Sequence, residues 1–336
     1  MKKTFLKSRF LTMAVAGLSL VIGGGILVSP LAHAQSFPSK PVTIIIPFAA
    51  GGPTDTVGRL VAQSMGTTLK QQFIVENVGG AGGTIGAARA AKSSPDGYTL
   101  FLNHIGQSTA STLYRKLSYS PIDSFEHIGQ IADVPMTLIA RKDFPAKDTK
   151  ELIAYAKANK DKITYANAGI GSASHLCGML FMSAIETDLT TVPYKGTGPA
   201  MNDLLGGQVD LMCDQTTNTT GQIKGGKVKA YAVTSKKRIA SLSDLPTIAE
   251  SGLPGFEVVV WHGLYAPKGT PTAVLDALNK ALKVAVSDPS FKQRLADLGS
   301  EPVADNLVRP EALRAQLKAE IDKWGPIIKK AGEYAD

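Results

Sequence analysis

The segment 41–56 constrains the fold more than any other part of this chain. Its residues 42–46 (Val-Thr-Ile-Ile-Ile) form a short β-branched run, which predicts a strand buried on both faces. The glycine pair Gly51-Gly52 follows, and apolar residues then recur at helical spacing from Val57 to Leu69. In this order, strand, loop and helix point free backbone N–H groups at the space above the carboxyl end of the strand. Ligands of open α/β sheets bind in that space, although a tight turn alone also explains one glycine pair.

A second unit of the same kind lies farther along the chain. Residues 163–166 predict a strand, residues 167–174 (Asn-Ala-Gly-Ile-Gly-Ser-Ala-Ser) form a loop, and a helical pattern starts near His175. Because the unit occurs twice, a ligand-binding role for both loops is favoured over turns alone. The backbone N–H groups of both loops would then face one ligand. A side chain added at Gly52 or Gly171 would fill the space that the ligand needs.

The order of the remaining elements predicts two α/β lobes. Strands and helices alternate through residues 73–102 and again through 149–233, so the sheet should be largely parallel. Two extended stretches, 127–141 and 256–265, are interpreted as the strands that cross between the lobes. The chain therefore resembles a hinged trap with one glycine loop on each side of the cleft.

The chain divides accordingly into a leader and two lobes. Three amphipathic helical patterns near its end return to the first lobe, and they cover residues 271–286, 289–298 and 309–330. The predicted divisions are a leader over 1–34, a first lobe over 35–133 and 258–336, and a second lobe over 134–257.

Residues 1–34 have the pattern of a secretory signal peptide. Basic residues precede an apolar run over 11–31, and the small-x-small sequence Ala32-His-Ala follows it. A transmembrane anchor is the alternative, but glycines at 23–25 and Ser29-Pro30 dilute the apolar run. We therefore predict export to the periplasm, with cleavage after Ala34.

Charge and composition exclude several functions. The whole chain carries a net charge of +8, and beyond residue 34 it keeps 32 basic and 28 acidic residues, a net charge of +4. No basic run with interleaved aromatic residues is present, so no nucleic-acid partner is predicted. No metal-ligand spacing is present, and no cofactor is predicted. Residues 80–86 match a G-x-G-x-x-x-G pattern, but they follow the second strand, so we interpret them as close packing at a helix start.

Five ordered motifs resemble those of the Bug-type (TctC-like) solute-binding receptors of tripartite tricarboxylate transporters. Together they span nearly the whole chain beyond residue 34. The motifs are residues 47–55, 165–176, 192–196, 204–210 and 244–257.

The resemblance implies an α/β fold of the type II periplasmic binding proteins, with two Rossmann-like lobes joined by two crossing strands. It implies a non-enzymatic, monomeric receptor that holds a small organic acid by its carboxylate and delivers it to a membrane permease. In the family, loops corresponding to residues 48–55 and 168–174 grip one carboxylate, largely through backbone amides and water. The candidate ligand-binding residues in these loops are Phe48, Ala49, Ala50, Gly51, Gly52, Thr54, Asp55, Gly169, Gly171, Ser172, Ala173 and Ser174.

Two further polar residues follow predicted strands and are candidates for the cleft. His104 comes two residues after the end of the strand over 98–102, where it contacts the ligand or is a hydrogen-bonded structural histidine. Asp214 comes after the strand that ends at Cys213, where it contacts the ligand or caps the next helix. Trp261-His262 on the second crossing stretch is interpreted as hinge packing.

Two other function classes are compatible with the sequence. An exported serine hydrolase would use Ser172 or Ser174 with His175 or His104, but no G-x-S-x-G elbow surrounds either serine. Ser174 is more simply the N-cap of the helix that follows. A sensor subunit that presents its liganded form to a signalling partner would use the same fold as a transport receptor.

Cys177 and Cys213 are the only cysteines of the chain. In an oxidising compartment they could pair in a disulfide, or both could remain buried free thiols.

Overall fold

The structure is a computed structural model that describes residues 37–332, 334 and 335. The predicted signal peptide and its cleavage site after Ala34 lie outside the described residues, all of which belong to one compact unit. Among the helices that these residues form, none combines the length and the apolar character needed to cross a membrane.

The first half of the fold is built on a mixed sheet. The strand β1 (Val42–Ile46) pairs in parallel with β2 (Phe73–Asn77) on one side and with β3 (Thr99–His104) on the other. Next to β3 the sheet continues with β9 (Val259–Pro267) and then β4 (Phe125–Arg141), both in antiparallel pairing. Four of the five residues of β1 are buried, Ile45 on one face and Val42, Ile44 and Ile46 on the other, while Thr43 is partly buried.

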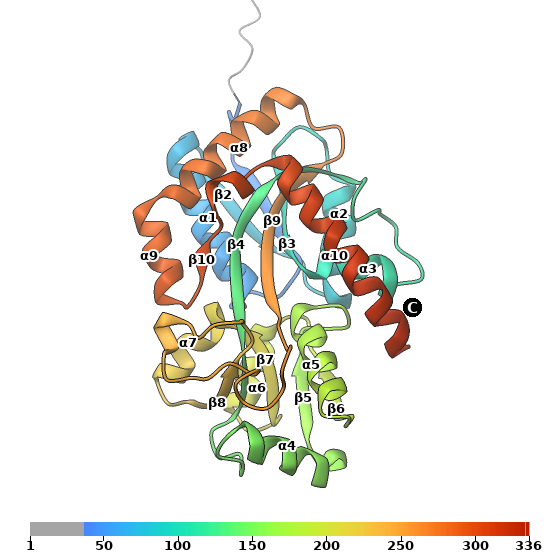
Figure 1. Ribbon diagram of the computed structural model, residues 1–336. Helices are drawn as coiled ribbons and strands as arrows, with labels where there is room; N and C mark the ends of the chain where they lie inside the picture. Colours follow the sequence, from blue (N-terminus) through green and yellow to red (C-terminus); the bar gives the residue numbers. More distant parts are fainter. Residues whose placement is uncertain (1–36, 333, 336) are drawn as a thin grey trace, which may run out of the picture. The chain divides into compact units, whose positions relative to one another are not determined.

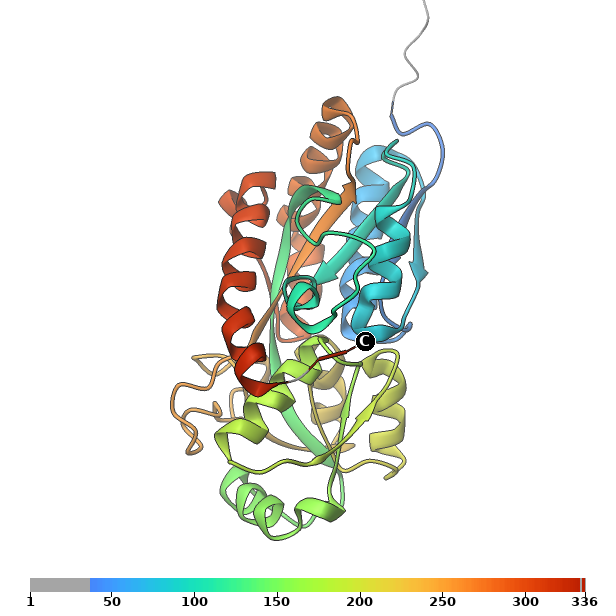
Figure 2. The ribbon, with the colours of Figure 1, turned by 90° about the vertical axis from the view of Figure 1, so that its right-hand side faces the viewer.

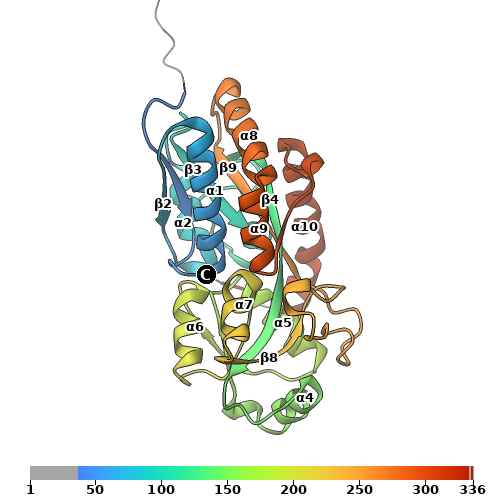
Figure 3. The same ribbon diagram turned by 90° about the vertical axis from the view of Figure 1, so that its left-hand side faces the viewer.

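Helices cover both faces of this sheet. On one face lie α1 (Pro53–Leu69), α8 (Thr272–Ser287) and α9 (Pro289–Asp297), which are side by side in Figure 3. Their apolar stripes pack with alternate residues of β1, Ile44 and Ile46, in one core cluster.

The opposite face carries α2 (Thr84–Ala91), α3 (Gly106–Leu113) and α10 (Pro310–Ala331). The long helix α10 lies along β4 and α3, as Figures 1 and 2 show. Ile45 of β1, which points away from Ile44 and Ile46, belongs to the core on this side. The C-terminal helices α8, α9 and α10 therefore all pack on the sheet that contains β1.

The second half of the fold repeats the parallel arrangement. The strand β5 (Thr164–Asn167) pairs in parallel with β6 (Thr190–Pro193) and β7 (Leu211–Gln215), while β8 (Val228–Val233) pairs with β4. Its helices are α4 (Thr149–Ala158), α5 (Ala173–Ala184), α6 (Thr197–Leu205) and α7 (Thr216–Lys224).

The crossing region differs from the sequence prediction in two ways. The stretch 127–141 is part of a single long strand, β4, which runs through both halves of the fold in Figure 1 despite Pro135. The sheet is also less parallel than predicted, because β4 pairs antiparallel with β7, β8, β9 and the short β10 (Glu301–Pro302). Parallel pairing is confined to the strands of each lobe that are joined by helices, since crossovers of that kind are what bring parallel strands together.

The helix α3 was not predicted. Its sequence, Gly-Gln-Ser-Thr-Ala-Ser-Thr-Leu, has no apolar stripe, yet most of its residues are buried. Leu113 of α3 packs in the core, and side-chain hydrogen bonds hold the polar part of the helix: Gln107 accepts from Asn103 at 3.0 Å and donates to Pro121 O at 3.2 Å. Periodicity of apolar residues cannot reveal a helix held in this way.

Candidate functional site

A small cavity lies between the two glycine loops that the sequence singles out. Its free volume is about 10 Å³, close to the minimum needed to hold one water molecule. The walls therefore meet closely, and a ligand of several carbon atoms requires them to separate. The lining residues are Phe48, Gly52, Pro53, Thr54, His104, Ala168, Ser172, Ala173, Ser174, Thr197, Asp214 and Gln215.

Several helices begin at this cavity. Pro53 and Thr54 open α1, Ala173 and Ser174 open α5, Thr197 opens α6, and Gln215 is the N-cap of α7. The first N–H groups of a helix have no acceptor within it, and the aligned peptide dipoles add a partial positive charge there. Among the described residues no lysine or arginine lines the cavity. In this part of the chain, the partial positive charge that faces the cavity is therefore that of the backbone N–H groups at the helix starts.

The loop before α1 is held by a carboxylate of its own helix. Asp55 accepts a hydrogen bond from Gly51 N at 3.0 Å, one from Asn77 Nδ2 at 3.0 Å and one from Arg59 Nε at 2.9 Å. Burial raises the pKa of Asp55, but these hydrogen bonds outweigh it and hold the pKa below its usual value. The N–H of Gly51 is therefore occupied by Asp55, while α1 has no side-chain cap on its first N–H groups.

The loop before α5 is held by neutral side chains. Ser174 Oγ accepts from Ala168 N at 2.8 Å, Asn167 Oδ1 accepts from Gly169 N at 2.8 Å, and His175 Nδ1 accepts from Gly171 N at 3.3 Å. The backbone N–H groups of Gly169 and Gly171 are therefore occupied within the loop. In the described chain, those of Ala173 and Ser174 in the first turn of α5 have no acceptor and adjoin the cavity.

Two local expectations about these loops are wrong. The helix α5 begins at Ala173, and its N-cap is Ser172, whose Oγ accepts from His175 N at 3.3 Å; Ser174 is not the cap. A Cβ at Gly171 would contact Leu113 Cδ1 at 3.0 Å rather than the cavity, so this glycine accommodates the other lobe.

His104 lines the cavity as a neutral ring. Its imidazole stacks on Phe48 with ring centroids 4.7 Å apart, and its Nδ1 accepts from Gly106 N at 3.0 Å. Burial, with the neighbouring His262, moves the pKa of His104 well below its usual value. Because Nδ1 accepts a hydrogen bond, the proton of the neutral ring is assigned to Nε2. The Nε2–H group is therefore a hydrogen-bond donor.

His262, interpreted from the sequence as hinge packing, lies beside the same site. It is fully buried, its Nε2 lies 3.5 Å from Thr54 Oγ1, and its ring meets that of His104 edge-on. Burial lowers the pKa of His262 to about 3, so this ring is also neutral.

Asp214 is the acidic group of the cavity wall. Its carboxylate accepts from Gln215 N at 2.8 Å and from Asn218 Nδ2 at 2.6 Å, and it is hydrogen-bonded to the side chain of Thr197. Burial raises the pKa of Asp214 to about 6, and the hydrogen bonds oppose that shift.

The cavity gathers most, but not all, of the predicted site residues. Phe48, Gly52, Thr54, His104, Ser172, Ala173, Ser174 and Asp214 line it, whereas Ala49, Ala50, Gly51, Asp55, Gly169 and Gly171 do not. Pro53 and Ala168 belong to the two predicted loops and also line the cavity, although neither was named as a candidate, whereas Thr197 and Gln215 lie outside both loops and were missed. Gln215 follows the predicted Asp214 at the end of a strand, so the strand-end argument applied to Asp214 also points to it.

Glycines and backbone atoms bring the two lobes together around the cavity. A Cβ at Gly82 would lie 1.8 Å from Ile170 O, so the lobes can approach this closely only because residue 82 is glycine. Beside it, Tyr114 Oη donates to Ile170 O at 2.8 Å, and Ala49 N donates to Lys195 O at 2.9 Å. The glycine pattern at 80–86, interpreted as packing at a helix start, therefore also forms a contact face toward the second lobe.

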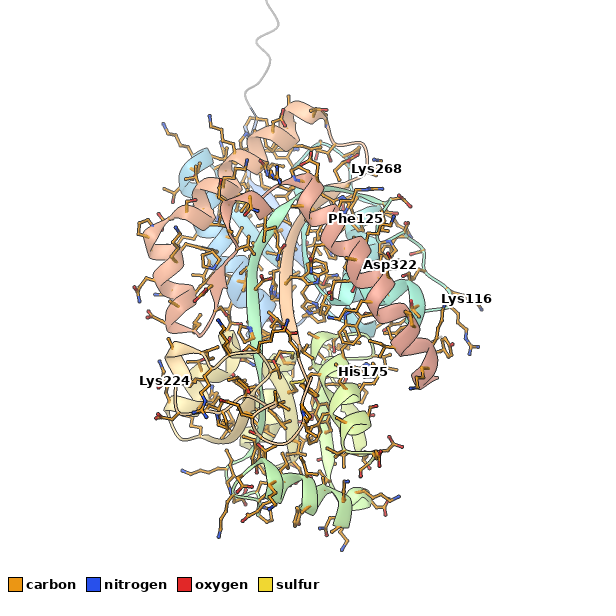
Figure 4. The ribbon with its side chains drawn as sticks, in the orientation of Figure 1. Lys116, Phe125, His175, Lys224, Lys268 and Asp322 are labelled. Carbon is orange, nitrogen blue, oxygen red and sulfur yellow. A yellow bond between two sulfur atoms is a disulfide. The ribbon has the colours of Figure 1, made fainter. Side chains whose placement is uncertain are left out.

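A disulfide fastens the helix beneath the second loop. The structure joins Cys177 of α5 to Cys213 of β7, and His175, labelled in Figure 4, lies two residues before Cys177 in the first turn of the same helix. The start of α5 is thus tied covalently to the strand that carries Asp214.

Comparison with known proteins adds a family and solved structures. A family model described as the tripartite tricarboxylate transporter family receptor matches residues 57–333. The structure of the periplasmic binding protein BugD is 57% identical, with a TM-score of 0.87, and covers 89% of this chain and 100% of its own. MatC from Rhodopseudomonas palustris with bound malate is 41% identical, with a TM-score of 0.84, over 87% and 100% of the two chains. Another R. palustris protein, solved with adipate, is 34% identical, with a TM-score of 0.83, over 88% and 98%.

Proposed function

The chain belongs to the tripartite tricarboxylate transporter receptor family, and from this premise we propose that it captures a small carboxylate between its lobes and delivers it to a membrane permease. The resemblance of the sequence motifs to this family is confirmed, and so is the predicted α/β fold of the periplasmic binding proteins. Two relatives were solved with small dicarboxylates, malate and adipate. The role of this chain as a receptor rather than an enzyme, its monomeric state and its permease partner belong to the proposal.

The observation that carries the proposal is the convergence of helix N-termini on one cavity without a cation. A carboxylate there accepts hydrogen bonds from the N–H groups of Ala173 and Ser174 and from the first turn of α1. Each charge-assisted hydrogen bond contributes about 1.5–3 kcal/mol, and a helix end adds about 0.3–1 kcal/mol. Three or four such contacts reach about 8 kcal/mol, the free energy of a micromolar complex, before ordering costs are subtracted.

The hydrolase alternative is disfavoured by the tautomers of the two histidines. A general base must accept a proton at a free nitrogen, yet Nδ1 of His104 and Nδ1 of His175 each accept a backbone N–H. Ser172 Oγ and Ser174 Oγ lie 3.1 Å apart and serve the backbone of their own loop. A sensor role uses the same closed cleft, and co-purification with permease subunits separates the two roles.

The lobe boundaries near residues 133 and 257 are part of the proposal. The pairing of β4 supports the first of them: its residues 125–135 pair with β9, and its residues 136–141 pair with β7 and β8. Export with cleavage after Ala34 is also proposed, and the intact mass of periplasmic protein, starting at Gln35, checks it.

A proline at the first position of α5 tests the proposal. Ala173→Pro removes one N–H at the cavity, and the extended Ser172 (φ −69°, ψ 160°) accommodates a following proline. Thr272→Pro is the matched control, because it removes the equivalent N–H of the exposed start of α8.

We expect calorimetric titration of the wild-type protein with a panel of dicarboxylates to give at least one ligand. Its affinity should fall at least tenfold in Ala173→Pro and should be unchanged in Thr272→Pro. Turnover of ester or amide substrates, or unchanged affinity in a folded Ala173→Pro variant, would contradict the proposal.

A further inference from the structure

The polar helix α3 of the first lobe contacts the second glycine loop. Thr109 Oγ1 donates a hydrogen bond to Gly171 O at 3.0 Å. Tyr114, the C-cap residue of α3, donates from its Oη to Ile170 O at 2.8 Å. Both acceptors are backbone carbonyls of the loop before α5, and both donors come from the other lobe. These hydrogen bonds can therefore form only while the lobes are closed.

Tyr114 has a defined position between the lobes. Its side chain is half-buried, and burial raises the pKa of Tyr114 to about 12, so the hydroxyl keeps its proton at neutral pH and donates it. A Cβ at Gly82 would lie 2.9 Å from Tyr114 Oη and 1.8 Å from Ile170 O. The glycine at 82 therefore leaves the space in which this hydrogen bond forms.

The chain that follows α10 holds the backbone of Tyr114. The helix ends at Gly332, whose φ of +70° turns the chain out of the helix. Ala335 N then donates to Leu113 O at 2.7 Å, and Arg115 N donates to Ala335 O at 3.4 Å. Ala335 thus forms a parallel β-bridge with Tyr114, and Figure 2 shows this part of the chain beside the boundary between the lobes.

Side chains add to this contact. The guanidinium group of Arg115 lies 5.0 Å from the centroid of the Tyr334 ring, within the range of a cation–π interaction. Ala335, Tyr114 and Ile170 line one groove at the edge of the contact between the lobes. The two residues after α10 therefore lie next to the hydrogen bond that joins the lobes, but on the first lobe alone.

We propose that residues 334 and 335 are a positioning segment, which holds Tyr114 so that its hydroxyl keeps the second glycine loop closed against the first lobe. The hydrogen bond is made in the closed state only, so it slows opening of the lobes and leaves access of the ligand to the open state unchanged. The effect on ligand affinity rests on the proposed function, whereas the effect on opening of the lobes does not.

Three changes to the chain test the inference. Tyr114→Phe removes the hydroxyl and keeps the ring. A chain that ends at Gly332 lacks the positioning segment, and Ala335→Pro removes only the N–H that Ala335 donates, in a chain of full length. Tyr231→Phe is the matched control, because Tyr231 Oη donates to Ala146 O at 3.0 Å inside the second lobe. Thermal unfolding checks that each variant is folded.

Hydrogen exchange of the protein without ligand measures opening of the lobes. The amide of Ala49 reports it, because Ala49 N donates to Lys195 O of the other lobe at 2.9 Å. We expect this amide to exchange about tenfold faster in Tyr114→Phe, in the shortened chain and in Ala335→Pro, and at the wild-type rate in Tyr231→Phe. The shortened chain that also carries Tyr114→Phe should exchange no faster than Tyr114→Phe, because the segment acts through the hydroxyl.

Titration with malate and with adipate measures the consequence for binding. The affinity of the tighter-binding probe should fall about tenfold in Tyr114→Phe and in the shortened chain, through faster dissociation, and should be unchanged in Tyr231→Phe. Stopped-flow measurement of the dissociation rate separates this effect from slower association.

The outcomes separate this inference from the proposed function. An Ala49 amide that exchanges freely in the wild-type protein, or at the wild-type rate in the folded Tyr114→Phe and Ala335→Pro variants, would overturn the inference. Effects that multiply in the combined variant would overturn it as well, because the segment would then act independently of Tyr114. If exchange responds as expected but neither malate, adipate nor any other carboxylate binds, the proposed function fails and the positioning role stands.

Discussion

The loops before α1 and before α5 face the same cavity, but their backbones are held by different chemistry. In the first loop, Asp55 ties Gly51 to Asn77 and forms an ion pair with Arg59. In the second loop, Ser174 and Asn167 hold the backbone through neutral hydrogen bonds, and the Cys177–Cys213 disulfide fastens the helix behind it. The conformation of the first loop therefore depends on a charged group and on pH. The conformation of the second loop depends on a disulfide and on neutral hydrogen bonds.

The difference also shows what the glycines do. Gly51 has φ +79° with nothing near its missing Cβ, whereas Gly169 and Gly171 lie against Gly82 and Leu113 of the other lobe. Their N–H groups are used inside the loop, so these glycines permit close approach of the lobes. The N–H groups at the start of α5, in contrast, have no acceptor within the described chain. Similar glycine motifs in one chain can thus serve a turn in one place and a contact between lobes in another.

The largest expected effect comes from breaking the disulfide. It closes a loop with a sequence separation of 36 residues, for which chain entropy predicts about 3–4 kcal/mol of stability. We expect reduction to lower the free energy of unfolding of the wild-type protein, measured in urea, by about this amount. The doubly substituted Cys177→Ala/Cys213→Ala variant should show no response to reductant.

Hydrogen exchange shows where the effect of reduction falls. Amides of α5 and β7 should exchange faster after reduction, and those of α1 should change little. Equal acceleration of exchange in α1 and α5 would contradict the prediction that the disulfide stabilises only the region of the second loop. Alkylation of two thiols without prior reduction would contradict the disulfide itself.

The next largest effect separates the two kinds of glycine. Gly82→Ala places a Cβ against Ile170 O, and Gly51→Ala places one in open space, although both positions have positive φ. Both variants should lose about 1 kcal/mol of stability from backbone strain. Only Gly82→Ala should keep the lobes apart and lower ligand affinity about a hundredfold, which corresponds to about 2.7 kcal/mol. Titration with the best-binding dicarboxylate measures the affinity of each variant. A similar loss of affinity in Gly51→Ala and Gly82→Ala would show that the two glycines do not differ in their effect on lobe contact.

The sequence predicts the parts of this fold that depend on local pattern. The strand over 42–46 and the helix that follows it match the structure because their apolar residues follow the period of each element. The helix α3 was missed because its buried side chains are mostly polar, follow no apolar period and are held by hydrogen bonds with Asn103 and Pro121. The position of Asp214 at a strand end was sufficient to place it at the cavity.

Other features of the site depend on contacts between distant segments. Thr197 reaches the cavity from the start of α6, directly after the motif at 192–196, but was not itself a candidate residue. The role of Gly171 depends on Leu113, which lies more than fifty residues away in the sequence and belongs to a helix that was not predicted. No local pattern distinguishes a glycine that faces a ligand from one that faces another lobe.

A smaller effect tests the charge dependence of the first loop. We expect Asp55→Asn to lower the free energy of unfolding at neutral pH by about 1.5 kcal/mol, the lower end for hydrogen bonds to a charged group because Arg59 is half exposed. The folded-state pKa of Asp55 is lowered, so its contribution is present above the usual value of 3.8 and is lost as the pH falls through the folded pKa.

The pH dependence distinguishes the two loops. The stability difference between the wild-type protein and Asp55→Asn should therefore disappear in acid. Ser174→Ala, which removes a neutral anchor of the second loop, should cause a loss that does not change with pH. Urea unfolding at several pH values measures both, and a constant difference for Asp55→Asn would show that its charge is not what holds the loop.

The smallest effect concerns the cap of α5. Ser172→Ala removes the acceptor of His175 N and should lower the free energy of unfolding by about 1 kcal/mol, the usual cost of losing an N-cap. Asp288→Ala removes the cap of α9, which accepts from Phe291 N at 2.9 Å and does not line the cavity, and it should lower the free energy of unfolding by about the same amount.

Only Ser172→Ala should also weaken carboxylate binding, about threefold, because the first turn of α5 then presents its N–H groups less rigidly. Thermal unfolding and titration of both variants check this. Equal effects on binding would mean that the start of α5 does not hold the ligand, whereas a hundredfold loss in Ser172→Ala would mean that the hydroxyl itself, and not the backbone, is the main contact.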